Sequence, residues 1–221
     1  MACLLIHGFT GGVFEVEYLK EYLSERGLPS YAISLKGHTG KRQDLRESTY
    51  MDWISSARDQ SLEISKNYEN VVLVGFSMGG LITLKIMDEL ATSKIVFVNC
   101  PIYLYDLKNL SSHIVRDVTK KNYSNLTRYK NASQIVSTKA IMNFLKILML
   151  TKNEFSKIAI ESLIIQCKDD EVVNSRSAEY IRKKIKDNVN IHYMETGGHR
   201  VFVGEEKNIA CEKVYDFLKY K

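Results

Sequence analysis

The chain has 221 residues, of which 45% are hydrophobic, and a formal net charge of +5 at pH 7. This length and apolar fraction suffice for one sizeable core and predict a soluble globular protein. No apolar run approaches the roughly 18 to 20 residues of a membrane-spanning helix, and the opening MACLLIHG lacks the features of a secretory signal, so we expect a cytoplasmic location without stable membrane insertion.

Short apolar runs typical of β-strands alternate with helical patterns along the chain. We expect strands over residues 2–8, 30–35, 70–76, 94–100, 162–170 and 190–195. Helices are expected over 13–27, 49–68, 78–91 and 175–185, with a last one ending near Lys219. Because the strand segments are nearly continuous apolar runs, both faces of the sheet should be covered, which predicts an α/β fold with a mostly parallel sheet and helices on both faces.

Two local patterns refine this prediction. Thr49 and Asp52 form the threonine-x-x-acid arrangement that satisfies free amides at a helix start. The four cysteines stand far apart, mostly in apolar runs and without CxxC spacing, which favours buried reduced thiols over disulfides or a metal site. They are Cys3, Cys100, Cys167 and Cys211.

Residues 104–157 interrupt the alternation, because they separate two strands that a single helix could have joined. We expect an α/β core over 1–103 and 158–221, with 104–157 inserted as a helical cap. The insert holds ten Lys/Arg and three Asp/Glu, a balance of +7, which leaves the rest of the chain near −2. An ordinary solvated surface explains this charge, and the alternative is weak contact with anionic substrates or lipid head groups. No nucleic-acid-binding module is recognisable.

Within the insert, residues 141–150 (IMNFLKILML) are apolar nearly all round. Such a helix is usually buried on several sides, so that core packing and a lid over an apolar acyl pocket are both open interpretations. The apolar residues of the insert favour an acyl or aryl ligand over a sugar or nucleotide. We expect such contacts from Ile114, Val118, Phe144, Leu145 and Leu148.

The segment Gly75-Phe76-Ser77-Met78-Gly79 matches GxSxG between an expected strand and an expected helix. In that context the turn is tight, and side chains larger than hydrogen at the two glycines would clash with neighbouring backbone. The turn should raise the Ser77 hydroxyl above the carboxyl end of the sheet. It should also leave the Met78 amide at a helix N-terminus, free to donate to an oxyanion.

A serine hydroxyl is a poor nucleophile at neutral pH and needs a base, with a third group that fixes the tautomer of that base. His199 follows the last expected strand in a glycine-rich loop and is our candidate base. Asp170, after the preceding strand, is the candidate acid, with the adjacent Asp169 and Glu171 as alternatives. The order Ser, Asp, His is the one that this kind of sheet uses.

The loop HGFTGG after the first strand is glycine-rich and can supply a second oxyanion amide, which we assign to Phe9. The alternative is that these glycines merely make a turn. We interpret His7 and His38 as structural rather than catalytic.

Together the segments LLIHGFTGG, LKGHTG, GFSMGG, IIQCKDDEVVN and GGHR resemble the α/β-hydrolase superfamily, and within it small bacterial carboxylesterases and monoacylglycerol lipases. The resemblance covers nearly the whole chain, and five motifs in order are more specific than any one. It implies a nucleophile, acid and base, two oxyanion amides and a cap over an acyl pocket, with no metal or other cofactor. The residues that match are Ser77, Asp170, His199, the Phe9 and Met78 amides, and 104–157.

Three features depart from the usual family pattern. The chain opens directly into the strand that leads to the HG motif, Cys167 stands where a glycine is usual, and Arg200 follows the histidine in place of an apolar residue. Arg200 should either lower the proton affinity of the base or contact an anionic substrate.

The expected activity is hydrolysis of small-molecule carboxylic esters with short to medium acyl chains, through an acyl-enzyme on Ser77. A thioesterase or acyltransferase using the same residues is the first alternative. A non-catalytic binding protein on this scaffold is the second.

Overall fold

The computed structural model describes residues 1–105, 137–185 and 187–219, and within them six strands form one parallel sheet. Their order across the sheet is β2-β1-β3-β4-β5-β6. The strands are β1 (Ala2–Ile6), β2 (Ser30–Ile33), β3 (Val71–Phe76), β4 (Thr92–Val98), β5 (Glu161–Cys167) and β6 (Val189–Met194). The prediction of an α/β fold with a parallel sheet is therefore confirmed.

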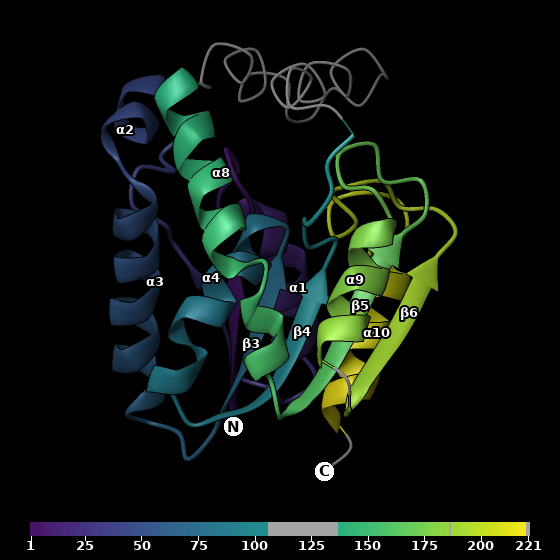
Figure 1. Ribbon diagram of the computed structural model, residues 1–221. Helices are drawn as coiled ribbons and strands as arrows, with labels where there is room; N and C mark the ends of the chain where they lie inside the picture. The colour runs from purple at the N-terminus through teal and green to yellow at the C-terminus, as the bar shows by residue number, and fades with distance from the viewer. Residues whose placement is uncertain (106–136, 186, 220–221) are drawn as a thin grey trace.

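Helices cover both faces of this sheet (Figure 1). They are α1 (Phe14–Ser24), α2 (Arg42–Glu47), α3 (Tyr50–Ser65), α4 (Met78–Ile86), α8 (Thr138–Thr151), α9 (Arg176–Ile185) and α10 (Lys207–Lys219), with 3-10 turns at Met87–Glu89 and Glu154–Lys157. Among the α-helices of the described residues, the short helix α2 is the one that the sequence did not predict. It buries only Leu45, so no periodic apolar pattern marks it.

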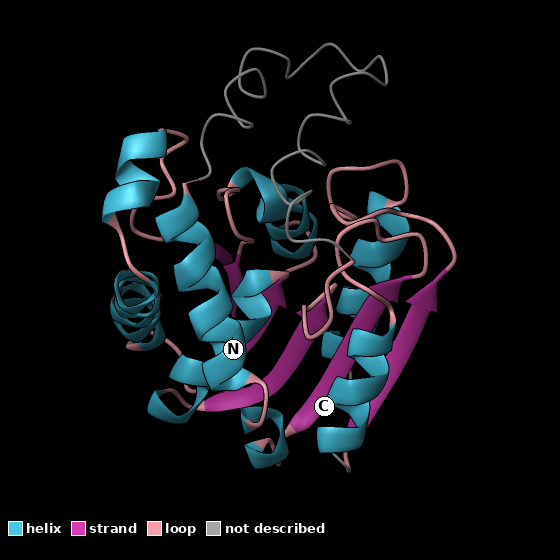
Figure 2. Cartoon of the chain, turned by 45° about the horizontal axis from the view of Figure 1, so that its top comes forward, coloured by secondary structure: helices cyan, strands magenta, loops and turns pink. Residues whose placement is uncertain are grey.

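The core has two layers because alternate residues of each strand point to opposite faces. In β1, Leu4 and Ile6 belong to the layer that also contains buried residues of α3, α4, α8 and α9, whereas Cys3 and Leu5 belong to the layer that contains those of α1 and α10. All four cysteines are free and buried, as predicted. The strands point the same way, and the loops that follow them gather along one edge of the sheet (Figure 2).

The start of α3 confirms the predicted capping box. The Thr49 hydroxyl oxygen accepts the Asp52 N–H at 3.3 Å, and the Asp52 carboxylate accepts the Thr49 N–H at 2.9 Å. This cap fixes the first turn of α3 and with it the buried Trp53.

Helix α8 packs one face against the core and leaves the other exposed. It buries Ala140, Phe144, Ile147 and Thr151, while Met142 and Met149 are 65% and 75% exposed. The Asn143 side chain accepts the N–H of Tyr50 at 3.1 Å and so ties α8 to the start of α3. None of the described helices has the length and apolar character required to cross a bilayer.

Candidate active site

Ser77 occupies the sharp turn between β3 and α4 in a strained backbone conformation, with φ 51° and ψ −124°. A Cβ at Gly75 would lie 2.4 Å from the Gly80 Cα, and a Cβ at Gly79 would lie 2.1 Å from the Ile6 carbonyl oxygen. Both positions are closed to any side chain, as the sequence pattern predicted. The turn therefore depends on hydrogen at both glycines.

Gly79→Ala is expected to lower the free energy of unfolding by about 3 kcal/mol or more, because its methyl group would press into rigid backbone of β1. Chemical denaturation measures the effect. Gly204→Ala is the matched control, since a Cβ there would meet nothing closer than 3.5 Å, and we expect a change within about 0.5 kcal/mol. Equal stability of the Gly79 and Gly204 variants would contradict the steric account.

The structure brings Ser77, His199 and Asp170 into one hydrogen-bonded chain from three separate loops. The His199 Nε2 atom lies 3.0 Å from the Ser77 Oγ atom, and His199 Nδ1 lies 2.8 Å from the Asp170 Oδ2 atom. Because a carboxylate accepts, Nδ1 carries the proton and Nε2 is the atom that can accept one from serine. Ser77 is 6% exposed and Asp170 3% exposed.

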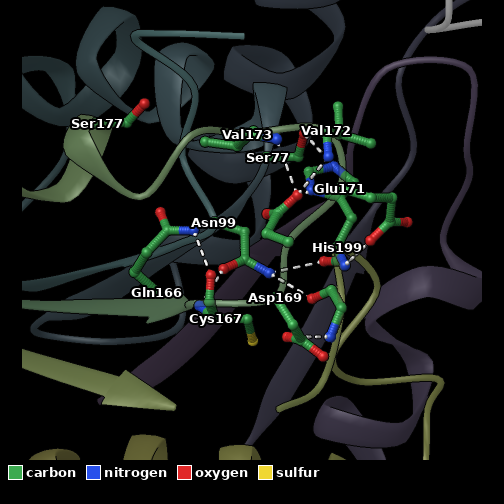
Figure 3. Close-up of polar contacts among 12 residues, drawn as sticks. Ser77, Asn99, Gln166, Cys167, Asp169, Glu171, Val172, Val173, Ser177 and His199 are labelled. Atoms are coloured by element: carbon green, nitrogen blue, oxygen red, sulfur yellow. Dashed lines mark hydrogen bonds and ion pairs between the residues drawn. The ribbon is translucent and has the colours of Figure 1, made fainter. Parts of the chain in front are cut away.

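Of the three adjacent acids, Asp170 is the one that reaches the imidazole. Figure 3 labels the other two, Asp169 and Glu171, beside the histidine loop. Asp169 accepts the N–H groups of Gly197 and Gly198 at 3.2 and 2.9 Å, and Glu171 accepts that of His199 at 3.1 Å. The second oxygen of Asp170 accepts the N–H groups of Val172 and Val173, both at 2.8 Å. Asp170 is thus fixed in orientation, while its two neighbours bind the backbone of the histidine loop.

The charges around His199 favour its protonated form. Burial by itself lowers the pKa of the imidazole, but the carboxylates of Asp170, Glu171 and Glu15 outweigh burial and raise the pKa above its ordinary value. Since only the neutral ring can accept a proton, any reaction that uses His199 as a base should slow as pH falls through this raised pKa.

The His7 side chain holds the start of the loop after β1 through two hydrogen bonds. The His7 Nδ1 atom donates to the Gly8 carbonyl oxygen at 2.9 Å, and His7 Nε2 accepts the Leu35 N–H at 3.3 Å. The bond from Leu35 requires a neutral ring with its proton on Nδ1, and burial lowers the pKa of His7 to about 4. The Gly8 carbonyl is thereby fixed, and the Phe9 N–H lies on the opposite edge of the same planar peptide.

Two amides are available beside this loop. Met78 is the first residue of α4, so its N–H has no partner within the helix. Among the hydrogen bonds of the described residues, neither the Phe9 nor the Met78 amide donates to another group. Both can therefore donate a hydrogen bond to a bound ligand.

Glu15, in the first turn of α1, is a member of the site that the sequence did not predict. It is 7% exposed, and its carboxylate accepts the Gly8 N–H at 3.1 Å. Burial raises its pKa to about 7, although the positive charge of Arg200 and the bond from Gly8 act in the opposite direction. The carboxylate also lies where a Cβ at Gly11 would be, only 1.9 Å away, which explains the glycine there.

Glu15→Gln is expected to stabilise the protein at about pH 8 by up to about 3 kcal/mol. The folded pKa of about 7 exceeds the ordinary 4.5, so the folded chain binds the proton more tightly and loses stability as pH rises from 4.5 to 7. Glutamine keeps an oxygen for Gly8 and carries no charge. Denaturant titrations at several pH values should show that the difference in free energy of unfolding between Glu15→Gln and the parent grows as pH rises from 4.5 to 7. The exposed control Glu21→Gln should show no such growth. A difference that does not vary with pH would contradict it.

Aromatic side chains lie next to Phe9, the residue whose amide is a candidate oxyanion donor. Its ring stacks on Phe144 of α8 with centroids 4.9 Å apart and lies 5.8 Å from the ring of Trp53. Leu145 and Leu148 are partly buried and pack against the same core. Of the five expected acyl contacts, the structure thus places Phe144 next to Phe9 and Leu145 and Leu148 against the core, whereas Ile114 and Val118 lie outside the described residues.

In the described ranges, no group of three or more His, Cys, Asp or Glu side chains has the arrangement of a metal site. The arrangement instead offers a hydroxyl, an imidazole, a carboxylate and two backbone amides. These are the groups that acyl transfer through a serine requires.

The chain matches the Alpha/beta hydrolase family over residues 3–210 and belongs to that family. A carboxylesterase of Bacillus subtilis (strain 168) is 27% identical over 229 residues, which cover 99% of this chain and 92% of that protein. A thermostable monoacylglycerol lipase of Bacillus sp. (strain H-257) is 24% identical over 189 residues, covering 80% and 74%.

Among solved structures, one from work on the metagenome-derived lipolytic enzymes LipS and LipT is similar, with a TM-score of 0.79 and 18% identity. The match covers 98% of this chain and 92% of that one, and at this identity it bears on the fold alone. The chain is therefore an esterase- or lipase-like α/β hydrolase, as the motifs predicted.

Proposed function

We propose that the protein hydrolyses small-molecule carboxylic esters with short to medium acyl chains, through an acyl-enzyme on Ser77. The observation that carries the proposal is the chain of contacts from Ser77 Oγ through the His199 ring to Asp170, at 3.0 and 2.8 Å. The naming of two distant relatives as a carboxylesterase and a monoacylglycerol lipase supports esters as the substrate class.

Acylation begins when His199 Nε2 takes the proton of the Ser77 hydroxyl and the oxygen attacks the ester carbonyl carbon. Asp170 keeps the other ring nitrogen protonated and stabilises the imidazolium that forms. The carbonyl oxygen becomes an anion and accepts the N–H groups of Phe9 and Met78. When the tetrahedral intermediate collapses, the ring proton goes to the leaving alcohol.

Deacylation repeats these steps with water as the nucleophile. His199 takes a proton from water, the hydroxide attacks the acyl carbon, and the ring returns the proton to the Ser77 oxygen as the carboxylic acid leaves. The enzyme ends in its starting protonation state. Because the same base and the same two amides act in acylation and in deacylation, removing any of these groups should slow both steps.

We assign the acyl chain to the apolar region beside Phe9, where Phe144 and Trp53 supply aromatic surface. In this proposal residues 104–157 form a cap over that region. Phe9 then has two roles in the proposed site: its backbone N–H donates to the oxyanion, and its ring contacts the acyl chain. A bulky acyl group should accordingly affect both KM and kcat.

Turnover should be measured across p-nitrophenyl esters and monoglycerides from about two to sixteen carbons, with matched acyl-CoA thioesters and with added alcohol. The proposal predicts hydrolysis of the oxygen esters, with the highest kcat/KM at short to medium length. Preference for the thioester would indicate a thioesterase, and transfer to the alcohol an acyltransferase. A folded protein inactive on every substrate would indicate a binding protein and contradict the proposal.

A further inference from the structure

Asn99, directly after β4, contacts the segments that carry the acid and the base. It is fully buried, and its side-chain nitrogen donates to the carbonyl oxygens of Gly198 at 3.1 Å and His199 at 2.8 Å. Its side-chain oxygen accepts the N–H of Cys167 at 2.9 Å. Because carbonyls only accept and an N–H only donates, these three partners fix the orientation of the amide group, which Figure 3 shows between Cys167 and the histidine loop.

The backbone at this position extends the same connection. The Asn99 N–H donates to the Ile165 carbonyl oxygen of β5 at 2.9 Å, and the preceding Val98 carbonyl accepts the Ser77 N–H at 2.8 Å. Two consecutive residues at the end of β4 therefore hold the serine turn, the strand that leads to Asp170 and the loop of His199.

Two requirements meet at Asn99. Its φ of 46° lies in the left-handed region, which glycine, asparagine and aspartate adopt most readily. Glycine has no side chain to reach the histidine loop, and an ionised aspartate has no N–H to donate. Asparagine is the residue that combines this backbone conformation with two donors and an acceptor.

The histidine loop is held on its other side by carboxylates in contact with water. The bonds from Gly197, Gly198 and His199 amides to Asp169 and Glu171 are exposed, whereas those from Asn99 are partly buried. Water can replace an exposed bond at small cost, but removing a buried donor leaves two carbonyl oxygens unsatisfied. Asn99 should therefore dominate the placement of the loop.

We propose that Asn99 is a positioning residue that ties the His199 loop to β5, so that the imidazole stays between Ser77 and Asp170 during the reaction. The inference rests on the proposed ester hydrolysis at Ser77. A displacement of about 1 Å in a reacting group can cost about 100-fold in rate, and supporting residues outside the reacting set typically contribute about 10- to 100-fold.

The test is Asn99→Gly, which keeps the backbone conformation and removes the amide. We expect kcat for a p-nitrophenyl ester to fall about 10- to 100-fold with KM within about threefold. We also expect the acidic limb of the pH–rate profile to move to lower pH. A ring that drifts from Asp170 loses part of the charge that, with Glu171 and Glu15, raises its pKa.

Gln166→Ala is the matched control. Gln166 is 1% exposed and also has a buried amide, but that amide donates to the Cys167 carbonyl at 3.0 Å and has no bond to the histidine loop. This variant should lose stability while keeping kcat and the pH–rate profile of the parent. An equal loss of kcat in the Gln166 variant would overturn the proposal, since the effect would then be general loosening of the core.

Asn99→Asp is a second variant of the same size, which keeps the acceptor for Cys167 and lacks both donors when ionised. It should lose kcat in the same way, by about tenfold or more. Parent-like kcat in either Asn99 variant would overturn the positioning role while leaving the proposed function intact. An inactive parent would instead contradict the proposed function.

Discussion

Replacing Ser77 with alanine is expected to lower kcat for ester hydrolysis by a factor on the order of 10⁶, to the limit of detection. The substitution removes the one oxygen that lies 3.0 Å from the His199 Nε2 atom and sits in a turn that fixes its position. Alanine adds no atoms, so the fold and its thermal transition should be retained. The measurement is single-turnover and steady-state hydrolysis of a p-nitrophenyl ester.

His199→Ala serves as the companion variant, because a nucleophile and its base act as a unit. It should lose about as much as Ser77→Ala, and the double variant should lose no more than either alone. A loss of kcat in the double variant equal to the product of the two single losses would indicate that the two side chains act independently. Either variant with parent-like activity would contradict the assignment of the nucleophile and the base.

Replacing Asp170 with asparagine is expected to lower kcat by about 10⁴. The carboxylate accepts from His199 Nδ1 at 2.8 Å and so holds the proton on that nitrogen. An amide in the same place can donate to Nδ1 and favour the tautomer in which Nε2 carries the proton, where it cannot act as a base. The pH dependence should change as well, because the largest favourable charge on the imidazole is lost.

Glu171→Gln and Asp169→Asn are the controls, since each removes one of the neighbouring charges. Glutamine keeps the oxygen that accepts the His199 N–H, and asparagine keeps one of the two oxygens that accept the Gly197 and Gly198 N–H groups. Each should reduce kcat by less than about tenfold. A larger loss in either control than in Asp170→Asn would contradict the assignment of the acid.

The sheet was predictable from the sequence because the four central strands, β1, β3, β4 and β5, contain apolar runs, and parallel strands covered on both faces require that pattern. The edge strands β2 and β6 are more exposed and carry a weaker signal. The short helix α2 was not predictable, because one buried leucine makes no periodic pattern. The predicted helix 78–91 was also too long at its C-terminal end, since α4 ends at Ile86 and a 3-10 turn begins at Met87. Such an end depends on tertiary contacts that a local pattern does not record.

The serine turn was predictable because the GxSxG pattern between a strand and a helix specifies both glycines. The clash at Gly75 is local, with the backbone of Gly79 and Gly80, whereas the clash at Gly79 is with the Ile6 carbonyl of β1 and appears only in the folded chain. Among the three adjacent acids the sequence favoured Asp170 and left Asp169 and Glu171 as alternatives, because a local pattern does not record which side chain turns toward His199 and which toward the loop amides. Glu15 and Asn99 escaped prediction for a related reason. Neither lies in a recognised motif. Asn99 bonds to a loop about one hundred residues further along the chain, and Glu15, although only seven residues from Gly8, carries no local signal that its carboxylate turns back to that amide.

Reaction of the folded chain with a fluorophosphonate, followed by mass spectrometry of its peptides, tests most directly whether Ser77 is an activated nucleophile. We expect one adduct per chain, on the peptide that contains Ser77, formed with loss of fluoride. The adduct should be absent from Ser77→Ala and form far more slowly on His199→Ala. A folded parent that gives no adduct, or one on a different serine, would contradict the account.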